Sequence, residues 1–183
     1  MSMTKKQNFF ILSSWIVFSR IFDALSTFEH TRDLSKEANP LVSILGLGWS
    51  PLLLIIGSLT AYSIFAFYQF TFKTKNLAPL QKDLGFVDYS IYLYLGEIKH
   101  WSAMLYQYPK EKWRLHQYLG AILAPCLVYA GILSTTMWLM IQHWPPYKDM
   151  HNPWLIYTLL VGGCVIIVYR FHRKSFQLYL ANN

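Results

Sequence analysis

Four long apolar runs dominate the pattern of hydrophobic and polar positions along this chain. At a rise of about 1.5 Å per residue, about 20 apolar residues in a helix cross the hydrocarbon core of a bilayer. The pattern therefore predicts an all-α polytopic membrane helix bundle, a single domain over residues 1–183. We place its spanning helices at residues 8–31, 50–72, 115–142 and 153–170.

The second apolar run starts earlier than one crossing requires. Asn39 and Pro40 mark a helix boundary in front of it, because proline restricts the preceding residue to extended conformations. Gly46 then interrupts the run, whereas Pro51 is tolerated in the first turn of a helix. We therefore expect a short helix or turn first, and the spanning helix from about residue 50.

The connection over residues 73–114 is basic, yet it carries an apolar repeat of seven residues. Its spacing of three and four is typical of an amphipathic helix, which we place near residues 84–107. Asp88, Glu97 and Lys99 argue against a membrane crossing, so we expect this helix in the headgroup region or against a partner. The two series that form the repeat are Leu84, Ile91, Ile98 and Leu105, and Val87, Tyr94 and Trp101.

Composition supports the membrane class. Charged residues make up only 14% of the chain, against about 25% in a typical soluble domain.

The first apolar run resembles a signal peptide, but it is long, contains Arg20 and Asp23, and lacks a small-residue cleavage site. We therefore expect an uncleaved first membrane helix.

The basic residues predict the orientation. Twelve of the 16 lysines and arginines fall on one side of a four-span topology, three fall on the other, and Arg20 lies within the first span. Positively charged loops stay in the cytoplasm. We therefore predict a multi-pass protein of the cell inner membrane with both termini and the 73–114 connection cytoplasmic. No motif for nucleic acid accompanies the net charge of +7.

The polar residues of the first span lie on one helical face. Arg20, Asp23, Thr27 and His30 are spaced three, four and three residues apart, and Asn39 follows in the loop. Ionisable residues inside a spanning helix cost roughly 2.5–3.5 kcal/mol each on insertion scales, so they usually face protein or water. On the structural interpretation, Arg20 and Asp23 form an internal ion pair, and the polar face of Arg20, Asp23, Thr27 and Asn39 fixes helix packing.

The functional interpretation uses the same region for chemistry. Asp23, His30 and Glu37 would converge on a metal ion or act as proton-transfer groups, since carboxylate and imidazole together suit zinc, iron or manganese. His143 and His151 lie on the same predicted side as His30. The spacing matches no established metal signature, so both interpretations stay open.

Two further features concern packing. Cys126 and Cys164 lie inside apolar runs, where thiols usually act as small hydrophobes, with an interhelical disulfide as the alternative. The third span has small residues four apart, a spacing that lets helices approach closely in lipid. Pro125 interrupts that span and predicts a kink. The small pairs are Gly120 and Ala124, Ala130 and Ser134, and Gly131 and Thr135.

The string FDALSTFEHTRDLSKEANPL carries a resemblance. Its Asp23, Thr27, Glu37, Asn39 and Pro40 follow in order with gaps similar to those of a D-A-x-S/T-T … E-A-N-P-L signature. In these twenty residues the chain resembles a family of small prokaryotic multi-pass membrane proteins. The resemblance implies membrane architecture and no particular activity, and the 73–114 connection and the tail lie outside it.

The remaining motifs narrow the function. The chain has no Walker loop, no G-x-G-x-x-G, no H-E-x-x-H and no G-x-S-x-G. We therefore expect a non-catalytic membrane subunit or assembly partner of a larger complex, in contact with lipid and with other subunits or copies of itself. The alternative is a small intramembrane metal-dependent enzyme or ion-handling protein that uses the polar face of the first helix. The sequence specifies no cofactor and leaves metal, pigment, quinone and lipid open.

The orientation is testable with reporter fusions. Fusions after Lys36 and Lys148 should report an external location, and a fusion after Lys75 should report a cytoplasmic one, because the basic residues concentrate on that side. An external signal after Lys75 would contradict the four-span topology.

Overall fold

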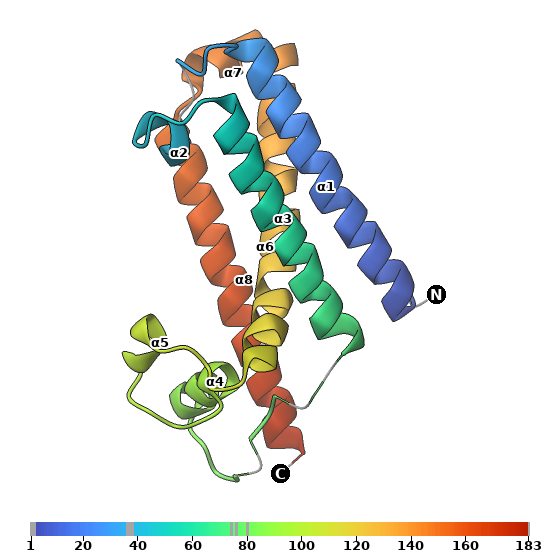
Figure 1. The fold of residues 1–183 in the computed structure, drawn as a ribbon, viewed down its shortest axis with the longest axis vertical. Coiled ribbons are helices and arrows are strands. Elements are labelled where there is room, and N and C mark those ends of the chain that lie inside the picture. The colour runs from blue at the N-terminus through green and yellow to red at the C-terminus, as the bar shows by residue number, and fades with distance from the viewer. Residues whose placement is uncertain (1–2, 36–38, 74, 76, 80, 183) are drawn as a thin grey trace. The chain divides into compact units, whose positions relative to one another are not determined.

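The computed structural model describes residues 3–35, 39–73, 75, 77–79 and 81–182. Over these residues the chain is helical and contains no strand, so the predicted all-α fold is confirmed. Figure 1 shows the helices in chain order: α1 Lys5–His30, α2 Pro40–Ser43, α3 Trp49–Phe72, α4 Phe86–Leu95, α5 Ala103–Tyr106, α6 Lys112–His143, α7 Pro145–Met150 and α8 Pro153–Ala181.

Four of these helices, α1, α3, α6 and α8, are long and apolar enough to cross a membrane. They overlap the four spans that the sequence predicts, and α2 is the short helix expected before the second span. The last helix runs further than expected, to Ala181, because Phe176 and Tyr179 of its final turns pack on Tyr89 of α4. The chain is therefore a membrane protein whose apolar helices contact the bilayer.

The start and end of α1 follow from local chemistry. The hydroxyl of Thr4 accepts a hydrogen bond from the backbone N–H of Gln7 at 3.2 Å, and the Gln7 side chain accepts one from Thr4 N at 3.0 Å. This reciprocal capping box satisfies two free donors of the first turn. At the other end Thr31 N–H bonds the carbonyl of Thr27 and closes the helix.

The contacts divide the chain into two compact units. The first consists of Met1–Tyr62 and Cys126–Cys164, and the second of Ser63–Pro125 and Val165–Asn183. The helices α3, α6 and α8 contribute residues to both units, with Pro125 at the boundary within α6. The sequence predicts a single domain and does not reveal this division.

In the second unit the predicted helix over residues 84–107 is wrong as a single element. Gly96 adopts the left-handed conformation (φ +83°) that commonly ends a helix, and it caps α4. Arg114 is only 6% exposed, and its guanidinium donates to the carbonyls of Tyr92 and Leu93 at the end of α4. The seven-residue repeat therefore spans a short helix, a loop and α5 rather than one face.

Glycines allow helices to approach closely within each unit. In the second unit a Cβ at Gly120 would lie 2.0 Å from the carbonyl oxygen of Ala66, so α6 meets the backbone of α3 there. In the first unit a Cβ at Gly131 would lie 2.4 Å from the hydroxyl of Ser19 on α1. Two of the small residues noted in the sequence thus serve helix packing.

Gly120→Ala should therefore destabilise the protein. Overpacking typically costs about 1–3 kcal/mol, and the clash is with backbone that cannot rotate away. Thermal unfolding in detergent measures the effect. Gly57→Ala is the matched control, because a Cβ there meets nothing within 4 Å and alanine is about 1 kcal/mol more favourable than glycine in a helix. Equal melting temperatures for the two variants would refute the close approach.

Candidate functional site

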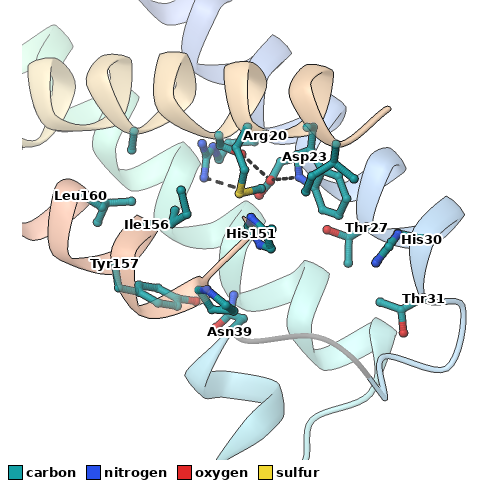
Figure 2. A pocket seen from close by; sticks show the side chains of 16 residues that line it. Arg20, Asp23, Thr27, His30, Thr31, Asn39, His151, Ile156, Tyr157 and Leu160 are labelled. Atoms are coloured by element: carbon teal, nitrogen blue, oxygen red, sulfur yellow. Dashed lines mark hydrogen bonds and ion pairs between the residues drawn. The ribbon is translucent and has the colours of Figure 1, made fainter. Parts of the chain in front are cut away.

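A cavity of about 290 Å³ lies within the first unit. Its walls come from α1, from α6 and from the start of α8. We call the end of the cavity beside α2 and α7, where Asn39 and His151 lie, its outer end. Figure 2 shows the side chains that line it: Arg20, Asp23, Thr27, His30, Thr31, Asn39, Ala130, Ser134, Met137, Trp138, Ile141, His151, Pro153, Ile156, Tyr157 and Leu160.

The polar side of the cavity is the face of α1 that the sequence singles out. Spacings of three and four residues place Arg20, Asp23, Thr27 and His30 on one side of a helix, and all four line the cavity. Asn39 joins them from the N-cap of α2, where its side chain accepts from Leu41 N at 3.0 Å. Glu37 lies outside the described residues.

Three hydrogen bonds join chain segments around the cavity, apart from those made by Asp23. The indole of Trp15 on α1 donates to the carbonyl of Val128 on α6 at 3.3 Å. The hydroxyl of Tyr129 on α6 donates to the carbonyl of Leu159 on α8 at 2.8 Å. The indole of Trp49 at the start of α3 donates to the carbonyl of Arg32 at 2.7 Å. These three contacts lie outside the cavity lining and stabilise the segments around it.

Asp23 is anchored mainly by α6. One carboxylate oxygen accepts from the hydroxyl of Ser134 at 2.5 Å and from the indole N–H of Trp138 at 2.9 Å. The other oxygen lies 3.9 Å from Nη1 of Arg20. The Arg20–Asp23 pair that the sequence predicts is thus present at long range. The sequence offers no signal for Trp138, and for Ser134 only its place in the small-residue series.

Arg20 uses its hydrogen-bonding capacity incompletely. Its Nε and Nη2 atoms are buried and have no hydrogen-bond partner within the described parts of the chain. These two nitrogens form one edge of the guanidinium, the edge that presents two parallel N–H groups to an acceptor. Buried polar groups in proteins almost always have a partner, in the protein or outside it.

Two histidines stand at the outer end of the cavity. His30 ends α1, and its ring lies 5.6 Å from that of Trp138. His151 precedes α8, and its Nδ1 is also buried without a partner among the residues described. Burial, and secondly the nearby His30, lower the pKa of His151 below its ordinary value of 6.5. His151 is therefore neutral at pH 7.

The cavity also has an apolar lining. Met137 and Ile141 of α6 and Ile156 and Leu160 of α8 line it, and each pair is four residues apart on one helical face. Figure 2 shows the α8 residues across from the polar side chains of α1. The cavity therefore combines an apolar wall with several hydrogen-bonding groups.

Metal binding has limited support. Over residues 3–35, 39–73, 75, 77–79 and 81–182, no three histidine, cysteine, aspartate or glutamate side chains gather closely enough to hold a metal ion. Asp23 and His30 share the cavity, but Glu37, the third predicted ligand, lies outside the described residues. Cys126 and Cys164 both belong to the first unit and are free thiols.

Removing the carboxylate should cost more stability than removing the cation. Asp23→Ala leaves Ser134, Trp138 and Arg20 without their acceptor, and each buried group left unsatisfied costs about 1–3 kcal/mol. Arg20→Ala removes one long contact and leaves both hydrogen bonds of Asp23 intact. Thermal unfolding in detergent should therefore rank Asp23→Ala below Arg20→Ala. The reverse order would contradict the anchoring by α6.

The histidine at the outer end predicts a pH dependence. A pKa lowered in the folded state means that the stability contributed by neutral His151 is complete above pH 6.5 and is lost as the pH falls through the folded pKa. The melting temperature should drop from pH 7.5 to pH 5.5, and His151→Gln should reduce that drop. His143→Gln, which changes an exposed histidine outside the cavity, should not reduce it.

Comparison with known proteins adds no relative: no family model, no curated protein and no solved structure matches this chain. The resemblance noted in the sequence accordingly stays a prediction.

Proposed function

We propose that this chain is a non-catalytic membrane protein that binds a small amphiphilic molecule in the cavity of its first unit. The observation that carries the proposal is the composition of the cavity walls. Arg20, Thr27 and His30 offer hydrogen bonds on one side, while Ile156 and Leu160 offer apolar surface on the other. Ligand sites typically combine a mainly apolar lining with a few polar groups that fix orientation.

The cavity is large enough for such a molecule. A cavity of about 150 Å³ binds benzene, and the volume here is about 290 Å³. It therefore admits roughly two fused rings, or one ring with a short chain. A larger amphiphile would place only its polar end inside and leave an alkyl chain among the lipids.

The polar residues support a binding role rather than a catalytic one. Asp23, the acidic group of the cavity among the residues described, is held by two donors of α6 and by Arg20. These contacts occupy one of its oxygens with two donors and place the other beside Arg20, so Asp23 is part of the packing between α1 and α6. We therefore assign Asp23 a positioning role for Arg20.

The orientation gives the cavity an external mouth. On the topology that the basic residues predict, the end of α1 and the α7 segment lie outside the cytoplasm. His30, Asn39 and His151 then stand at the external surface of an inner-membrane protein, and Arg20, near the middle of α1, stands at membrane depth. A ligand would enter from the external surface or from the outer leaflet.

A second candidate function is that of a subunit or assembly partner of a larger membrane complex, as the sequence predicts. The surface of α8 favours the role of a subunit. None of the residues in the most apolar stretch of α8 is buried, whereas 33% of the residues in the corresponding stretch of α6 are buried. A Cβ at Gly162 of α8 would meet no atom within 4 Å, so a helix of another subunit, or of a second copy, has room to approach closely. Extraction in a mild detergent followed by native electrophoresis tests this candidate by the size of the species.

Filling the cavity tests the binding proposal. Leu160→Trp places a larger side chain against the cavity wall, and Val161→Trp is the matched control, since Val161 is 58% exposed and outside the lining. The parent protein and Val161→Trp should retain a bound small molecule in native mass spectrometry, and Leu160→Trp should lose it. Equal retention by the two tryptophan variants would contradict the proposal. Stoichiometric metal that is lost in Asp23→Ala would favour the metal-dependent alternative instead.

A further inference from the structure

The environment of Arg20 indicates which chemical class of ligand the cavity binds. The side chain of Arg20 is 21% exposed, yet its Nε and Nη2 atoms are buried without an acceptor in the described residues. A charged donor left unsatisfied in a membrane-spanning helix is costly. A ligand in the cavity that Arg20 lines would supply the missing acceptor after a rotation of the side chain, a common adjustment on binding.

The charges of the cavity select among acceptors. The described residues that bear or can gain charge are Arg20, Asp23 and His30 on α1, His151 before α8 and Tyr157 on α8, and α6 contributes none. Arg20 and Asp23 cancel each other. A carboxylate or phosphate at the free edge of Arg20 would leave a net negative charge close to Asp23 in a medium of low dielectric.

His151 does not compensate for such a charge at neutral pH. The pKa of His151 lies below its ordinary value through burial and through the neighbouring His30. An uncharged ligand meets no such cost, because a carbonyl oxygen accepts hydrogen bonds from a guanidinium without adding charge. Hydrogen bonds to a charged donor are also stronger than those between neutral groups.

We propose that the cavity binds an uncharged, largely apolar carbonyl compound, such as a ketone, quinone or ester, whose oxygen accepts hydrogen bonds from the Nε and Nη2 edge of Arg20. This inference rests on the proposed function and specifies its ligand class. The apolar body of the molecule lies against Ile156 and Leu160, and the carbonyl points toward the middle of α1.

Three probes of similar shape separate the alternatives: naphthalene, 2-acetylnaphthalene and 2-naphthoate. They provide an apolar body alone, the same body with a carbonyl, and the same body with a carboxylate. Equilibrium dialysis of the purified protein in detergent at pH 7.5 measures their affinity. Binding to Leu160→Trp, the filled cavity, is subtracted to remove partition into micelles.

We expect 2-acetylnaphthalene to bind about tenfold or more tightly than naphthalene, and more tightly than 2-naphthoate, as one charged hydrogen bond implies. Arg20→Met should abolish the advantage of the ketone over naphthalene, while Arg170→Met, at an exposed arginine of α8, should preserve it. If Arg20→Met does not fold, the ranking of the three probes in the parent protein still decides the question.

Other outcomes overturn the inference in distinguishable ways. Equal binding of the ketone and naphthalene would mean that Arg20 does not contact the ligand. Tighter binding of 2-naphthoate would assign the site to anions, and both results would leave the cavity proposal intact. If no probe binds the parent protein more than Leu160→Trp, both this inference and its use of the cavity are wrong, and retention of a native molecule in mass spectrometry then decides the proposed function separately.

Discussion

The fold of the first unit depends on placing the charges of α1 inside a membrane. An arginine and an aspartate near the middle of an apolar helix must face protein or water, because lipid offers no hydrogen bonds. The α6 helix meets this requirement with Ser134 and Trp138, which donate to Asp23. Gly131 permits the approach, since its missing Cβ leaves room for Ser19. The position of α1 against α6 follows from these contacts.

The α8 helix contributes apolar side chains to the cavity that these contacts border. Its Ile156 and Leu160 face the polar residues of α1 without donating or accepting hydrogen bonds. Arg114 of the second unit provides an informative contrast. There one nitrogen, Nη1, donates to the carbonyls of Leu77, Tyr92 and Leu93, at 3.1–3.4 Å. In Arg114 a buried nitrogen thus has several backbone acceptors, whereas two buried nitrogens of Arg20 have no acceptor among the residues described. That difference supports a ligand-binding role for Arg20.

The apolar repeat over residues 84–107 predicted one helix, but a single residue, Gly96, interrupts that helix. The seven-residue repeat has helical spacing, but Gly96 ends α4 in the middle of the repeat. The repeat includes Leu84, Ile91, Ile98 and Leu105. Arg114 stabilises the break by binding the carbonyls that α4 leaves free. As a result Ile91 is 1% exposed and Leu105 78% exposed, although the repeat treats them alike. Apolar periodicity indicates which residues would share one face of a helix, but it does not indicate where that helix ends.

The sequence by itself determined the four spanning helices, since their apolar length is a local property that the bilayer imposes. It also determined the polar face of Arg20, Asp23, Thr27 and His30, because helical geometry fixes which residues share a side. Only the tertiary structure decided what that face meets. Ser134 and Trp138 lie 111 and 115 residues from Asp23 in the chain, and His151 enters from the segment before α8. Such contacts depend on which helices pack against one another, and the periodicity of a helix does not specify its partner.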